Sequence, residues 1–144
     1  MNHAPIYISR DDHAKLRLLL TTALHARTNS SLQRLREELD RAVVLDPSAI
    51  PADVVTLDSK VAFEDLGTNE VEEYAITFPE RANPEARRLS ILAPIGIALI
   101  GCRVGDVVNW STPGGTRQLK IRGVTQPDPT VRAAYVVPAF NGYR

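Results

Sequence analysis

The segment that decides the fold is ILAPIGIALIGCRVGDVVNW, residues 91–110. Within it, the apolar run APIGIALIG at 93–101 predicts a short buried helix. Pro94 suits the first position of that helix, where a missing N–H costs nothing. Gly101 suits the position just past its end, where the chain turns left-handed. The residues on either side then predict the sheet that such a helix covers.

The segments after the helix predict a β-hairpin. DVVNWS (106–111) and RQLKIRGV (117–124) are rich in strand-forming residues, and TPGG between them has the composition of a hairpin turn. In the second segment Leu119 and Ile121 alternate with Lys120 and Arg122. Because side chains alternate between the two faces of a strand, we expect one face to be buried and the other to be wet and basic.

The segments before the helix predict two more strands. KVAFEDL (60–66) and EEYAITF (72–78) are separated by a turn through residues 67–69. ERANPEAR (80–87) reads as a polar loop. Together the four segments predict an antiparallel sheet covered by one helix.

The N-terminal third has a different texture, since residues 9–45 are leucine-rich and contain neither Gly nor Pro. Ser9 and Asp12 have the spacing of a capping box at the start of a first helix. A second helix begins at Ser30 or Ser31, and its apolar residues recur at alternating spacings of three and four. Two helices of roughly 15 to 17 residues, about 25 Å each, joined by a short polar turn, should pack antiparallel as a hairpin.

These textures predict an α+β chain of two parts. A short coiled-coil hairpin occupies residues 1–48, and the sheet with its helix and a C-terminal tail occupies 49–144, with Pro47 and Pro51 at the boundary. Because so short a hairpin is marginal alone, we expect its base to dock on the second part. The apolar stretch AAYVVPAF in the tail predicts either an edge strand or a contact with another molecule.

Composition sets limits on function. The 144 residues carry a formal net charge of zero, which argues against strong independent nucleic-acid binding. Cys102 is the only cysteine, so no intramolecular disulfide can form and a reducing cytoplasm is the expected compartment. The N-terminus lacks the pattern of a signal peptide, and no apolar run is long enough to span a membrane.

The segment from Ala93 onward resembles the C-terminal domain of the bacterial transcription elongation factors GreA and GreB. That family has the form Ser-Pro-apolar-Gly-x-Ala-Leu-Leu-Gly followed by Val-Gly-Asp, which Ala93, Pro94, Gly96 and the residues through Asp106 follow, with Ala93 in place of the usual serine. IPADVVTLDSKV at 50–61 resembles the start of that domain in the branch called regulators of nucleoside diphosphate kinase. The resemblance implies a coiled coil followed by an FKBP-like α+β domain.

It also implies a partner, RNA polymerase. Family members bind at the rim of its secondary channel through the C-terminal domain, and the coiled coil points into the channel. By that resemblance Pro94 and Ile95 form a docking surface. The alternative is that Pro94 only starts the helix and Ile95 belongs to the core.

The predicted tip of the hairpin differs from that of the Gre factors, which carry acidic residues there that help to hold a metal ion in the polymerase active site. Magnesium prefers charged oxygen ligands. Between Asp12 and Glu37 this chain has no carboxylate but five cations, so we expect no stimulation of transcript cleavage. The tip residues are Arg27, Thr28, Asn29, Ser30 and Arg34. Their charge either serves solubility or approaches an anionic surface.

Enzymatic readings are weak, and we expect no catalytic residue, metal, cofactor or small-molecule substrate. The three histidines all precede residue 26 and lack ligand spacing, while Cys102 reads as a small buried hydrophobe. A prolyl isomerase needs an aromatic-rich pocket, and only 6% of the residues are aromatic. A candidate basic face, which is either a weak nucleic-acid contact or solvated surface, consists of Arg117, Lys120 and Arg122.

The sequence therefore favours a non-enzymatic regulator that binds RNA polymerase and, by the resemblance, affects nucleoside diphosphate kinase levels. One alternative is a transcript-cleavage factor. Another, from a different class, is a stand-alone FKBP-like interaction module or prolyl isomerase.

Overall fold

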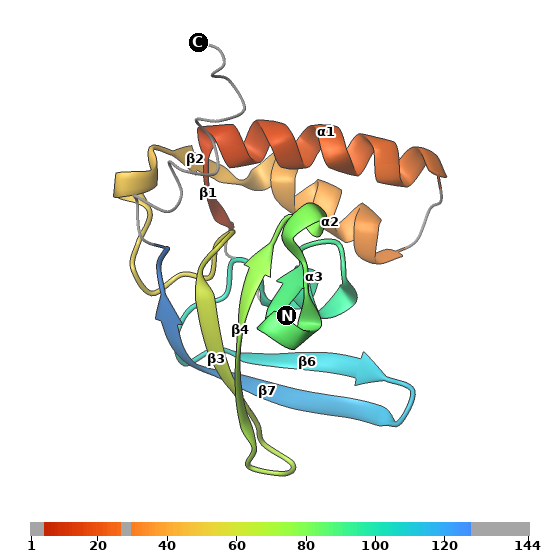
Figure 1. Cartoon of the computed structure of the whole chain (residues 1–144), viewed down its shortest axis with the longest axis vertical. Coiled ribbons are helices and arrows are strands. Elements are labelled where there is room, and N and C mark those ends of the chain that lie inside the picture. The colour runs from red at the N-terminus through yellow and green to blue at the C-terminus, as the bar shows by residue number, and fades with distance from the viewer. Residues whose placement is uncertain (1–4, 27–29, 128–144) are drawn as a thin grey trace.

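The computed structural model describes residues 5–26 and 30–127 of the chain. Two N-terminal helices form an antiparallel hairpin that lies across one end of a curled five-stranded sheet, and a short third helix sits between them (Figure 1). The predicted α+β class, with a helical hairpin before the sheet, is confirmed.

The first helix, α1, spans Arg10–Ala26, and the second, α2, spans Ser30–Arg41. The predicted cap is present, since the Ser9 hydroxyl accepts a hydrogen bond from the Asp12 N–H at 3.2 Å. The helices meet along the leucine seam that the sequence indicated, formed by Leu16, Leu20, Leu32, Leu35 and Leu39, all at most 4% exposed.

The second helix has 12 residues and is shorter than expected. The reason is that β-branched residues follow it: Val43–Leu45 leave the helix as strand β2 and pair in parallel with strand β1, Tyr7–Ser9. The three residues before α1 and the three residues of β2 after α2 therefore form a two-stranded sheet at the base of the hairpin (Figure 1).

The main sheet has the strand order β5-β4-β3-β7-β6. The expected hairpins are present, and three of the four neighbouring pairs are antiparallel. The fourth pair, β4 with β5, is parallel and was not indicated by the sequence. Short 3-10 turns at Pro47–Ala49, Pro79–Arg81 and Pro84–Ala86 connect the elements. The strands are β3 (Lys60–Asp65), β4 (Val71–Thr77), β5 (Arg88–Ser90), β6 (Val107–Thr112) and β7 (Gly115–Thr125).

The third helix, α3, spans Pro94–Leu99, with Pro94 in its first turn as predicted. Gly96 within the helix and Gly101 just after it leave no room for a side chain. A Cβ on Gly96 would lie 2.4 Å from the Ser90 carbonyl oxygen, and one on Gly101 would lie 2.2 Å from the Ile6 Cγ2. Gly101 also has a φ of +82°, the left-handed conformation expected at that position. The glycines thus let α3 approach β5 and the N-terminal segment closely.

One hydrophobic cluster runs through both parts of the chain, from the leucines of the hairpin to the inner face of the sheet. The hairpin is therefore packed against the sheet domain through α2 and α3, in addition to its base. Within the described ranges, no helix is long and apolar enough to cross a membrane.

Candidate functional site

A groove of about 410 Å³ opens on the inner face of the sheet beside the start of α3. Three aromatic side chains from three different strands line it: Phe63 of β3, Tyr74 of β4 and Trp110 of β6. The rings of Phe63 and Tyr74 stack with centroids 6.1 Å apart. Ile95 of α3 closes one side. We call this the aromatic groove, and its partly exposed apolar lining is the kind of surface that docks another protein.

Carboxylates form the rim of the aromatic groove. Asp65, Glu70 and Glu72 line it together with a single cation, Arg117. Arg117 donates a hydrogen bond to Asp65, which lowers the pKa of that carboxyl group, with further lowering from the N–H of Gly67. The Asp65 carboxylate therefore stays charged well below neutral pH, and the hydrogen bond holds the two side chains together at the rim. Glu72 is also paired, with Arg87 at 3.3 Å, so the three acids face two bases and the rim keeps a net negative charge that suits a cationic partner.

The two residues that the resemblance assigns to docking lie at this site. Pro94 is exposed at the start of α3, and Ile95 is half-buried, contacting the core on one side and the aromatic groove on the other. Ala93 is the capping residue of α3 and makes no side-chain cap; the Ser90 hydroxyl instead accepts from the Leu92 N–H at 3.0 Å. Of these two residues Ile95 lines the aromatic groove, and Pro94 is its neighbour in the chain.

Of the predicted tip residues, Arg27, Thr28 and Asn29 lie outside the described residues. Ser30 is exposed at the first position of α2. Among the other cations of this interval, Arg17 pairs with Asp40 at 2.7 Å, and Lys15 pairs with Glu80. Part of the positive charge near the hairpin is therefore neutralised by acids at its base and on the sheet domain.

Arg34 lies at a second cleft, of about 420 Å³, between α2 and the sheet domain. Cys102 and Asp106 line the same cleft from the other side. Burial, with a smaller contribution from the charge of Asp106 and against the opposing charge of Arg34, raises the pKa of the Cys102 thiol to about 12. Cys102 is thus the small buried hydrophobe that the sequence indicated, and it is a poor nucleophile. A cation early in α2 opposes the helix dipole, and two carboxylates that line the same cleft, Glu38 and Asp106, offset this cost.

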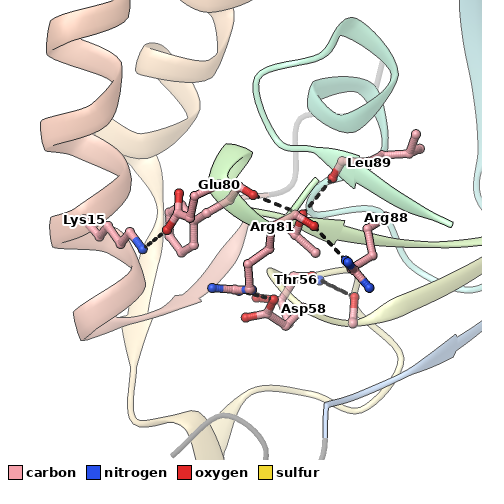
Figure 2. Close-up of polar contacts among 10 residues, drawn as sticks. Lys15, Thr56, Asp58, Glu80, Arg81, Arg88 and Leu89 are labelled. Carbon is pink, nitrogen blue, oxygen red and sulfur yellow. Dashed lines mark hydrogen bonds and ion pairs between the residues drawn. The ribbon is translucent and has the colours of Figure 1, made fainter. Parts of the chain in front are cut away.

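The hairpin is anchored to the sheet domain by a polar network between α1 and the turn after β4 (Figure 2). Lys15 reaches Glu80 and lies 4.2 Å from the centroid of the Phe78 ring. Arg81, next in the chain, pairs with Asp58 at 2.5 Å. The hydrogen bond and charge of Lys15 lower the pKa of Glu80.

We expect removal of this anchor to have a pH-dependent cost. Because the pKa of Glu80 is lower in the folded chain, its ion pair stabilises above the ordinary pKa of 4.5 and this contribution is lost as pH falls. Replacing Glu80 by Gln should lower the free energy of unfolding at pH 7 by less than about 1 kcal/mol, since the pair is half exposed. Urea unfolding should show this difference at pH 7 and a smaller one at pH 3.

Replacing Lys15 by Ala is the matched comparison, because it removes both the ion pair and the contact of the side chain with Phe78. That variant should stay less stable than the parent at pH 3. A Glu80→Gln deficit of equal size at both pH values would contradict the role of the ion pair.

The structure does not gather the three residues of the candidate basic face into one open patch. Arg117 lies on the inner face with Leu119 and is bound to Asp65. Arg122 lies where the β3–β7 register shifts and pairs with Glu64 at 3.4 Å. Lys120 opposes Glu64 across the strands. The basic face remains a prediction, with carboxylates beside each of its members.

In the part of the chain that the structure describes, no group of three or more His, Cys, Asp or Glu side chains could hold a metal ion. His13 is occupied locally, with its Nε2 3.0 Å from the Leu39 carbonyl oxygen. The aromatic groove is lined by aromatic, aliphatic and charged side chains, a composition typical of a surface that binds a partner.

Sequence reasoning missed the aromatic groove. Its signal was present within each strand, since Phe63 lies two residues from Val61, Tyr74 two from Ile76, and Trp110 two from Val108, so each aromatic shares a face with an apolar residue. The alternation places each aromatic on the buried side of its own strand. Only the strand order brings the three together.

Comparison with known proteins agrees with this architecture. Residues 50–126 match the family model for the C-terminal domain of the GreA/GreB transcription elongation factors, and residues 5–45 match the model for the Rnk N-terminus. The regulator of nucleoside diphosphate kinase of Escherichia coli K12 is 36% identical over 80% of this chain and 84% of that protein. The elongation factor GreA of Clostridium beijerinckii is 38% identical over 69% of this chain and 62% of that protein.

Among solved structures, a GreA/GreB elongation factor from Nitrosomonas europaea is similar, with a TM-score of 0.75 and 35% identity. The match covers 86% of this chain and all of that chain. The fold, the two family models and these relatives agree, and the chain belongs to the GreA/GreB transcription elongation factor family, in the branch of the regulators of nucleoside diphosphate kinase.

Proposed function

We propose that the protein is a transcription regulator that binds RNA polymerase at the rim of the secondary channel and does not stimulate transcript cleavage. Its sheet domain docks, with Pro94, Ile95 and the aromatic groove as the contact surface, and its short hairpin faces the channel. The observation that carries this proposal is the exposed, acid-rimmed aromatic groove beside the residues that the family resemblance assigns to docking.

The proposed lack of cleavage stimulation rests on the hairpin sequence. No carboxylate occurs between Asp12 and Glu37, so the far end of the hairpin offers no charged oxygen for a metal ion. The acids of α2 that the structure describes lie toward its C-terminal end, and two of them, Glu38 and Asp40, are paired with arginines. The hairpin, by occupying the secondary channel, then excludes other factors that bind there. The protein acts in the cytoplasm, where RNA polymerase is located. An effect on nucleoside diphosphate kinase levels, as in the names of the relatives, would follow through transcription.

Two measurements test this function. Core RNA polymerase titrated into the protein, labelled at its N-terminus, should give saturable binding at micromolar concentration or below. Stalled elongation complexes should show no faster RNA cleavage with the protein than without it, whereas a GreA factor accelerates cleavage in parallel. Absence of binding would overturn the docking proposal, and faster cleavage would establish the transcript-cleavage alternative.

A further inference from the structure

A third cavity, of about 420 Å³, lies between strands β3 and β4 and the segment that leads into β5. It differs from the aromatic groove in the sign of its charge. Four cations line it, Lys60, Arg81, Arg87 and Arg88, against two carboxylates, Asp58 and Glu73. We call it the basic pocket.

Two of these cations lack a carboxylate partner. Most cations of the described residues are ion-paired, among them Arg81 with Asp58 and Arg87 with Glu72. Lys60 and Arg88 form no ion pair within the described ranges. The pocket therefore carries a local excess of positive charge, whereas most cations elsewhere on the described surface are paired with carboxylates.

The guanidinium groups of the pocket are held in place. Arg88 donates from Nε to the Arg81 carbonyl oxygen at 2.7 Å, while the Arg81 side chain is fixed by Asp58 (Figure 2). The Arg88 bond uses the inner edge of its guanidinium and leaves the terminal N–H groups for a ligand. Because these side chains are ordered before binding, less conformational entropy is lost when an anion enters.

Two residues that line the pocket have strained backbone conformations. Asp58 and Arg87 both line it, and both have left-handed backbone conformations, with φ of 68° and 61°. This conformation is uncommon for residues other than glycine and costs of order 1 kcal/mol for a bulky side chain such as arginine. Such residues concentrate at binding sites, where the rest of the structure maintains them.

From these features we propose that the basic pocket binds a phosphate group, with Lys60 and Arg88 as its principal contacts. Guanidinium groups bind phosphate oxygens through paired N–H donors, and a neighbouring ammonium matches a second negative charge. Tyr74 leaves no free ring face for a base, since Phe63 stacks on it and Arg87 lies 5.0 Å from its centroid. The ligand is thus recognised by its phosphate, and two negative charges, as on a terminal phosphate or pyrophosphate, fit better than a single phosphodiester charge.

The test is a titration of the full chain with inorganic pyrophosphate, followed through backbone amide resonances in magnesium-free buffer. We expect saturable shifts at Lys60, Arg88 and their neighbours. A single-stranded oligothymidylate without terminal phosphates, titrated in the same way, tests the phosphodiester as an alternative source and should bind more weakly at this pocket.

Three variants locate the site. Replacing Arg88 by Gln should weaken pyrophosphate binding at least about fivefold, as expected for loss of a charge-assisted contact. Replacing Arg10 by Gln removes one positive charge at an exposed position outside the pocket and should leave the affinity unchanged. Replacing Glu73 by Gln removes a repelling carboxylate at an exposed position and should tighten binding severalfold, an effect that loss of folding cannot imitate.

The proposal is overturned by absence of saturable shifts, by equal losses in the Arg88 and Arg10 variants, or by an unchanged affinity in the Glu73 variant. Tighter binding of the oligothymidylate than of pyrophosphate would also overturn it, in favour of a nucleic-acid backbone as the ligand.

Discussion

Replacing Gly96 by Ala should lower the free energy of unfolding by about 3 kcal/mol, a large loss for one methyl group. The added Cβ would lie 2.4 Å from the Ser90 carbonyl oxygen and 3.2 Å from the Ile91 Cα. Both are backbone atoms and cannot swing away as a side chain can. The gain in helix propensity of up to about 1 kcal/mol from glycine to alanine is too small to compensate. Urea unfolding at neutral pH, followed by far-UV circular dichroism, measures the difference.

Gly123 supplies the matched control. A Cβ added there meets no atom within 4 Å, and its φ is not in the left-handed range. Replacing it by Ala should therefore change the stability by less than about 0.5 kcal/mol. Similar losses for the two substitutions would show that the close approach of α3 to β5 is not what fixes Gly96.

Replacing Ile95 by Glu should weaken binding to core RNA polymerase by at least tenfold, if the proposed docking surface is correct. The change removes an apolar contact at the centre of the patch. It also adds a fourth carboxylate to a groove that already holds Asp65, Glu70 and Glu72. The same binding titration as for the parent chain measures the loss, and a melt confirms that the half-buried position tolerates the change.

Two further variants sharpen this prediction. Pro94→Glu changes an exposed residue of the same surface, so its effect on binding cannot arise from the core. Val104→Glu introduces the same charge at a residue that is 45% exposed and does not line the aromatic groove. Binding should fall with Pro94→Glu and stay close to the parent value with Val104→Glu. Equal losses in all three variants would point to net charge and would contradict a specific surface.

The segment 91–110 could be interpreted from sequence because its structure is locally determined. Pro94 starts the helix, Gly101 ends it in a left-handed turn, and Asp106 closes the next turn by accepting from the Arg103 N–H at 2.9 Å. Each of these roles involves residues within a few positions of one another. Local geometry of this kind leaves a recognisable residue pattern.

The features that escaped prediction depend on pairing between distant segments. Strands β1 and β2 have three residues each, too few for alternation to be recognised, and a whole hairpin separates them. Strand β5 is equally short and pairs in parallel. The 6% aromatic content argued against an aromatic pocket, yet strand order gathers Phe63, Tyr74 and Trp110 in one groove. A low overall content does not limit local concentration.

The parallel pairing of β1 with β2 has a mechanical consequence. The two strands hold both roots of the hairpin at one point, with Val43 N–H bonded to the Ile6 carbonyl at 2.9 Å, so the helices cannot splay apart at their base. The hairpin then behaves as a stiff lever. With an arm of ~25 Å for the 17 residues of α1, a tilt of ~5° at the fulcrum sweeps the far end through ~2 Å. A small change of angle at the base of the hairpin, at β1 and β2, therefore displaces the far end of α1 by more than an atomic bond length.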